Sequence, residues 1–131
     1  GNCNEITKVV EPLLQIDGGN IYYINISQDD FKLGGSSFNQ TLNTIGNEAP
    51  DVKNTAFVKE TFNTIQNLIQ KDAITAGHDI ASGGLITTLL EMCFADVNLG
   101  LKIDFSVFEE KDIVKYLFAE NRTKSIVPNH R

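Results

Sequence analysis

The stretch 78–85, which reads His-Asp-Ile-Ala-Ser-Gly-Gly-Leu, constrains the fold of this chain more than any other part of it. The apolar run 73–77 before it is predicted to be a strand, and the apolar-rich run 85–95 after it a helix. A strand that enters a helix through Gly83 and Gly84 presents backbone N–H groups where the first helical turn and its dipole favour an anion. The lack of a Cβ allows a phosphate to approach closely. The pattern therefore predicts an α/β unit with an anion-binding turn.

The residues of this turn that we predict to bind a substrate phosphate are His78, Asp79, Ser82, Gly83, Gly84 and Leu85. The last three would donate backbone N–H groups, and His78 and Asp79 would lie at the carboxyl end of a strand, where open α/β sheets bind ligands. Protonated His78 would add a donor. A structural interpretation stays open, because a glycine pair also ends strands and lets a helix pack closely. No nucleophile paired with a base is visible, so no catalytic residue is predicted.

A second glycine turn is a possible second anion site, formed by Lys32, Gly34, Gly35 and Ser36. Ser36 or Ser37 can cap a helix that carries apolar residues at helical spacing up to Ile45. Lys32 would neutralise a phosphate, but a plain helix cap beside a solvated lysine explains the same residues. Asp29 and Asp30 are possible Mg²⁺ ligands, although neighbouring loop acids are commonly surface charge, and no metal site is predicted.

The remaining periodicity predicts strands at 6–10, 21–27 and 100–105. It also predicts an amphipathic helix from about 54 to 71 and a last helix at 109–119. The run 85–95 is apolar nearly all round, which indicates a helix that is buried or covered by a partner. The predicted fold is α/β (α+β), a three-layer sandwich of helices on a mixed sheet.

Length and composition indicate one ordinary globular domain of 131 residues. The net charge of −6 disfavours nonspecific nucleic-acid binding. No apolar run approaches the length of a membrane span. Cys3 and Cys93 show neither zinc spacing nor a disulfide framework, which favours a reducing, cytoplasmic location.

Three motifs, in order along the chain, resemble the phosphoribosylformylglycinamidine synthase family. They are Lys-Leu-Gly-Gly-Ser at 32–36, the stretch 78–85 with the helix Thr-Thr-Leu-Leu-Glu-Met-Cys-Phe-Ala at 87–95, and Leu-Phe-Ala-Glu-Asn at 117–121. The resemblance is to the C-terminal type of domain in the aminoimidazole-ribonucleotide-synthetase-like superfamily. It implies a three-layer fold like that of the C-terminal domain of aminoimidazole ribonucleotide synthetase.

The resemblance also implies a function. The family converts formylglycinamide ribonucleotide to its amidine with ATP and glutamine, in purine biosynthesis. An N-terminal-type synthetase domain would hold most of the ATP and Mg²⁺, and a glutaminase domain would supply ammonia. No cofactor is expected in this chain itself. Its contribution would be the glycine-rich turn for a ribonucleotide phosphate.

Two departures from the family pattern qualify this expectation. Ala81 and Ser82 stand where the family usually has Ser and Asp, and the chain after Asn121 differs from the family's valine-rich strand. We therefore expect a single, C-terminally incomplete domain whose residues 1–5 and 122–131 are loose or atypical. Such a piece should lack synthase activity alone and should tend to self-associate. The alternatives are a non-catalytic assembly domain of the same enzyme, or a related ATP-dependent synthetase or kinase of the superfamily.

Overall fold

The computed structural model describes residues 5–16, 19–28, 30–106, 109, 112–120 and the backbone of 124–128. Its elements, in chain order, are η1 (Ile6–Lys8), β1 (Ile21–Asn25), α1 (Ser37–Thr41), α2 (Thr55–Gln70), β2 (His78–Asp79), α3 (Gly84–Cys93), α4 (Ile113–Phe118) and β3 (Lys124–Pro128). Two helices separate each strand from the next along the chain, in keeping with an α/β fold. None of the helices in the described ranges is long and apolar enough to span a bilayer.

The three described strands form one sheet in the order β1-β3-β2. β3 is its centre and pairs antiparallel with both neighbours, with Ile21 opposite Pro128 and His78 opposite Ile126. Residues 124–128 of the tail thus form the central strand of this sheet. The mixed sheet is not confirmed, since these strands contain no parallel pair. Residues 1–4, 121–123 and 129–131 lie outside the described part of the chain.

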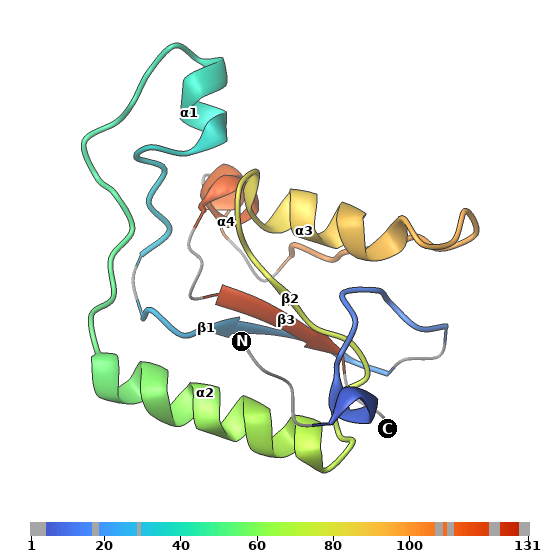
Figure 1. Cartoon of the computed structure of the whole chain (residues 1–131). Coiled ribbons are helices and arrows are strands. Elements are labelled where there is room, and N and C mark those ends of the chain that lie inside the picture. The colour runs from blue at the N-terminus through green and yellow to red at the C-terminus, as the bar shows by residue number, and fades with distance from the viewer. Residues whose placement is uncertain are drawn as a thin grey trace.

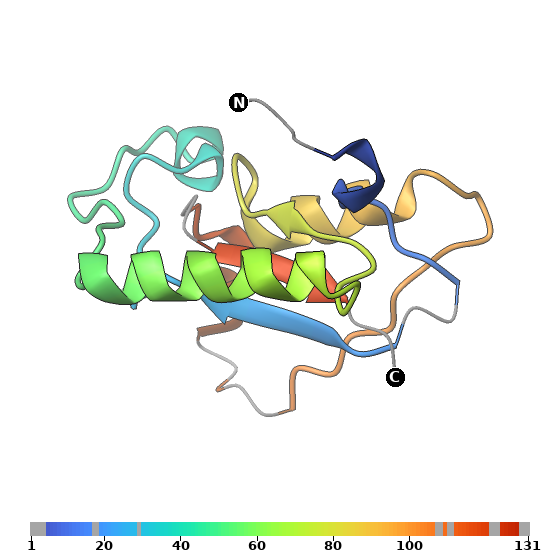
Figure 2. The same cartoon turned by 60° about the horizontal axis from the view of Figure 1, so that its bottom comes forward.

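Helices lie on both sides of this sheet (Figure 1). α2 runs along one side and α3 and α4 lie on the other, and the turned view in Figure 2 shows the same separation. The buried core lies on the α3 side. Its central residues are Ala76, Ile80, Leu89 and Met92, and Leu14, Leu85 and Leu101 pack against them. α2 itself contains no fully buried residue.

Two predicted strands are wrong in the described structure. Residues 6–8 form the short helix η1, held by local bonds such as Lys8 N–H to the Glu5 carbonyl. Residues 100–105 pair with no described strand, and the Asp104 carboxylate bends the chain by accepting the Ser106 N–H at 2.8 Å. Since strand structure needs a neighbour to satisfy its backbone, both segments take local bonds instead. The predicted β-α-β unit is therefore not formed here, and its first strand is reduced to β2 and an isolated bridge at Ile74.

The predicted helices are confirmed, with shifted ends. α1 begins at the Ser36 cap, whose hydroxyl accepts the Asn39 N–H, and it stops early because Asn43 turns to a left-handed φ of 55°. α2 begins at the Asn54 cap, whose side chain accepts the Phe57 N–H. α4 covers 113–118, a shorter span than the 109–119 expected.

Candidate functional site

The glycine pair that ends the stretch 78–85 has left-handed backbone at both positions, with φ of 87° at Gly83 and 74° at Gly84. Gly83 is the N-cap of α3 and Gly84 is the first residue of that helix. A Cβ on Gly84 would lie 2.5 Å from the carbonyl oxygen of Leu117 and 2.7 Å from the Cα of Phe118. Real Cβ atoms do not approach backbone atoms that closely, so glycine lets α3 start directly against the end of α4. The close-packing interpretation of the pair is supported at this position.

Two backbone donors of this turn, those of Gly83 and Gly84, already have partners. The Gly83 N–H donates to Glu120 Oε1 at 2.8 Å, and the Gly84 N–H donates to the Ala81 carbonyl at 3.1 Å. The same oxygen of Glu120 accepts the Ser37 N–H at 2.7 Å. A carboxylate of the chain itself therefore occupies the position where the sequence predicts an external anion.

The backbone N–H groups of the second glycine turn also bond to carbonyls of the chain itself. The Gly34, Gly35 and Ser36 N–H groups donate to the carbonyls of Glu48, Ile45 and Leu33 at 2.9, 2.8 and 3.0 Å. A Cβ on Gly34 would meet the Glu48 carbonyl, so this glycine too is a point of close backbone approach.

A cleft of about 640 Å³ lies next to this second turn, and both Lys32 and Gly34 line it. The other charged side chains along the cleft are Asp30, Glu48, Asp112 and Lys115. Acids thus outnumber bases in the lining, which disfavours a second phosphate site built around Lys32.

Glu120 carries its charge in this position. Burial alone raises the pKa of its carboxyl, but hydrogen bonds from the Gly83 and Ser37 amides and from the Ser37 side chain lower it, and the net pKa lies below the ordinary glutamate value. The carboxylate is ionised at neutral pH. It also lies at the start of α1 and of α3, where a negative charge is favourable.

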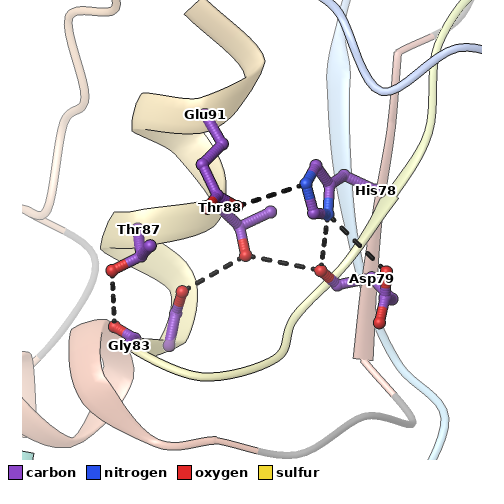
Figure 3. Close-up of polar contacts among 7 residues, drawn as sticks. His78, Asp79, Gly83, Thr87, Thr88 and Glu91 are labelled. Atoms are coloured by element: carbon purple, nitrogen blue, oxygen red, sulfur yellow. Dashed lines mark hydrogen bonds and ion pairs between the residues drawn. The ribbon is translucent and has the colours of Figure 1, made fainter. Parts of the chain in front are cut away.

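His78 projects from β2 toward α3, where Glu91 faces it (Figure 3). Its Nε2 lies 3.3 Å from Glu91 Oε2, and its Nδ1 lies 2.7 Å from the Asp79 carbonyl and 3.7 Å from Asp79 Oδ1. Carbonyl and carboxylate oxygens only accept, so both contacts become hydrogen bonds when the ring is an imidazolium. The imidazole is thus held by α3 and by its own strand.

Two threonines fix the first turn of α3 (Figure 3). The Thr87 hydroxyl lies 3.2 Å from the Gly83 carbonyl, and the buried Thr88 hydroxyl lies 3.2 Å from the Gly84 carbonyl and 3.4 Å from that of Asp79. Thr88 therefore ties the strand that carries His78 to the helix that carries Glu91.

The structure brings most of the predicted residues of the first turn together. His78, Asp79 and Gly84 share a network with Thr88 and Glu91, and Gly83 bonds separately to Glu120 and Thr87. Ser82 is exposed, and Leu85 packs on the core. Ser37, Thr88 and Glu120 were not predicted. The motif 117–121 contained the glutamate, but its partners lie 37 and 83 residues away along the chain.

Within the described ranges, no three His, Cys, Asp or Glu side chains gather as a metal site would require.

The comparison with known proteins gives the family. Residues 20–127 match the family described as AIR synthase related protein, C-terminal domain. The chain belongs to this family.

Three curated relatives share the name phosphoribosylformylglycinamidine synthase. The chain is 39% identical over 106 residues to a probable phosphoribosylformylglycinamidine synthase, chloroplastic/mitochondrial, of Arabidopsis thaliana, covering 79% of this chain and 8% of the relative. It is 39% identical over 126 residues to phosphoribosylformylglycinamidine synthase of Dictyostelium discoideum, covering 90% and 9%. The human protein of that name is 36% identical over 120 residues, again covering 90% and 9%. The resemblance read from the three motifs is confirmed, and the chain spans less than a tenth of the length of these relatives.

Proposed function

We propose that this chain is part of a phosphoribosylformylglycinamidine synthase, a ligase that makes formylglycinamidine ribonucleotide from formylglycinamide ribonucleotide, ATP and glutamine in purine biosynthesis. One observation carries the proposal: residues 20–127 match the synthetase-type C-terminal domain, and relatives 36–39% identical share that enzyme name. The identity extends over most of the chain, so it is not limited to a single glycine motif.

The proposal assigns the chemistry to the whole enzyme and a supporting role to this part. ATP and Mg²⁺ would be held mainly by an N-terminal-type synthetase domain, and ammonia would come from a glutaminase domain. The complete domain would be a three-layer sandwich with a mixed sheet, in a cytoplasmic enzyme. The composition supports that location, because two cysteines without a disulfide framework suit a reducing compartment.

The contribution of this chain would be the turn 82–85 as a contact for a ribonucleotide phosphate. The geometry sets a condition on that role. The Gly83 and Gly84 N–H groups are bonded to Glu120 and Ala81, so a phosphate that uses the Gly83 amide must displace the Glu120 carboxylate.

A second candidate function is a non-catalytic assembly domain of the same enzyme. The bonds of the Gly83 and Gly84 amides favour it directly, because amides that bond to the chain itself need no ligand to satisfy them. In that case Gly84 serves only the contact between α3 and α4.

Titration of the ¹⁵N-labelled chain with inorganic phosphate, and then with formylglycinamide ribonucleotide, separates the two functions. Shifts in the amide resonances of Gly83 to Leu85 support the phosphate contact, and unchanged resonances at saturating ligand favour the assembly domain. The ligase assignment is tested by assaying the complete parent polypeptide with formylglycinamide ribonucleotide, ATP and glutamine. We expect turnover there and none from the 131-residue chain alone.

A further inference from the structure

The Glu120 carboxylate joins two turns that are distant in sequence. Its Oε1 accepts the Ser37 N–H at 2.7 Å and the Gly83 N–H at 2.8 Å, across separations of 83 and 37 residues. Ser37 is the first residue of α1 and Gly83 is the N-cap of α3. One oxygen atom therefore links the starts of two helices.

Packing contacts of the neighbouring residues fix the backbone next to Glu120 and so orient its carboxylate. Gly84 brings α3 against the backbone of Leu117 and Phe118. The Phe118 ring stacks on that of Phe38, with centroids 4.7 Å apart and planes 24° apart. After α4 the backbone becomes extended at Ala119, a buried residue with 2% of its surface exposed. These contacts surround Glu120 on the α1 and α3 sides.

We propose that Glu120 is a positioning residue that couples the two glycine turns. One oxygen of its carboxylate holds both the Ser37 and the Gly83 amide, so a change in the hydrogen bond at one turn alters the hydrogen bond at the other. The inference rests on the proposed function in one respect: Gly83 belongs to the turn assigned to phosphate. The coupling itself involves only groups of this chain.

The chemistry of the contact predicts which substitutions preserve it. A carboxylate oxygen accepts two hydrogen bonds, and so does the side-chain oxygen of glutamine, at nearly the same reach. Glu120→Gln should therefore keep both amides bonded, although without the added strength of a charged acceptor. Glu120→Ala leaves both amides without that acceptor.

The first test compares ¹H–¹⁵N spectra and amide hydrogen exchange of the full chain and its variants, without ligand. For Glu120→Ala we expect the Ser37 and Gly83 resonances to move together and both amides to exchange roughly tenfold faster or more. Glu120→Gln should restore most of the protection. The matched control is Glu91→Gln, which removes an acid of α3 that pairs with His78 and should leave the Ser37 resonance in place.

A second variant tests the coupling by removing a donor instead of the acceptor. It keeps the proposal testable if the Glu120→Ala chain does not fold. Ser37→Pro removes the N–H and the hydroxyl that Ser37 donates to Glu120 and leaves the Gly83 N–H in place. The substitution is compatible with the fold because proline suits the first position of a helix. The preceding Ser36 has φ of −70° and ψ of 154°, which is the conformation that a following proline requires. Ser37→Ala is its control, since it removes the same hydroxyl and keeps the amide.

We expect Ser37→Pro to shift the Gly83 amide resonance across the shared carboxylate, and Ser37→Ala to shift it less. The assignment is overturned if Glu120→Ala moves only one of the two amides, if Glu120→Gln behaves like Glu120→Ala, or if Ser37→Pro leaves Gly83 unchanged. These spectra contain no phosphate, so a failed phosphate titration would count against the proposed function and leave the coupling standing.

Discussion

Gly84 approaches the end of α4 so closely that a Cβ on it would lie 2.5 Å from the carbonyl oxygen of Leu117. The neighbours at this contact are backbone atoms, which cannot rotate away as a side chain can. The requirement for glycine at position 84 therefore comes from helix packing, whether or not a ligand also uses the turn.

This contact predicts that Gly84→Ala destabilises the chain far more than Gly35→Ala. The two glycines have almost the same φ, 74° and 75°, but a Cβ on Gly35 would meet nothing within 4 Å. Gly35→Ala should cost about 1–2 kcal/mol of unfolding free energy, from left-handed backbone alone. Gly84→Ala adds an overpacking cost of about 1–3 kcal/mol or more. Urea unfolding of the two variants measures the difference, and equal losses would mean that α4 can move away at little cost.

The lowered pKa of Glu120 predicts a specific acid sensitivity. A carboxyl whose folded pKa lies below its unfolded value stabilises the fold above the unfolded pKa, near 4.5, and this stability is lost as the pH falls through the folded pKa. The wild-type chain should therefore exceed Glu120→Gln in unfolding free energy at pH 7, and the gap should close as the pH falls below about 4.5. Denaturant unfolding at several pH values tests this, and a gap independent of pH would contradict it.

The described fold could be predicted from sequence only where local signals were sufficient. The periodicity of about 54–71 and the capping serines at 36–37 correctly indicated helices, because capping and amphipathicity are local. The central strand β3 was missed because its identity depends on β1 and β2, which lie far away in sequence. Residues 100–105 showed a strand pattern but found no described neighbour to pair with.

The site shows the same division between local and distant information. The sequence predicted glycine turns at 34–35 and 83–84, and the structure has left-handed backbone at Gly35, Gly83 and Gly84 and a close backbone contact at Gly34. That a single carboxylate joins Ser37 to Gly83 could not be derived, because it depends on how α1, α3 and α4 pack. The motif 117–121 indicated that Glu120 matters without indicating its partners.

Thr88 should contribute more to stability than the contact between His78 and Glu91. Because 47% of the Glu91 side chain is accessible, Glu91→Gln should cost less than about 1 kcal/mol of unfolding free energy. The Thr88 hydroxyl is buried beside the Gly84 and Asp79 carbonyls, and Thr88→Val removes it while keeping the shape. We expect a loss of about 1–2 kcal/mol for that change. Thermal unfolding at pH 7 ranks the two variants, and a larger loss for Glu91→Gln would reverse this assignment.

The outer face of α3 predicts self-association. The helix is apolar nearly all round, and Leu90 is 52% exposed, followed by Phe94 at 74% and Val97 at 99%. These residues border an apolar groove of about 400 Å³ between α3 and the segment 99–103. An exposed apolar patch of this kind on an isolated chain favours contact with a second copy. Sedimentation velocity should therefore show a concentration-dependent increase in mass.

The same measurement on two charge variants locates the interface. Leu90→Lys with Phe94→Lys should return the chain to a monomer, because a lysine at a closing apolar contact loses hydration without gaining a partner. Phe62→Lys is the matched control, since Phe62 is a similarly exposed apolar residue, at 56%, on α2 across the sheet. If Phe62→Lys dissociates the oligomer and the α3 variant does not, copies meet through the exposed face of α2 that carries Phe62. A chain that stays monomeric at all concentrations would show that the α3 face does not drive association.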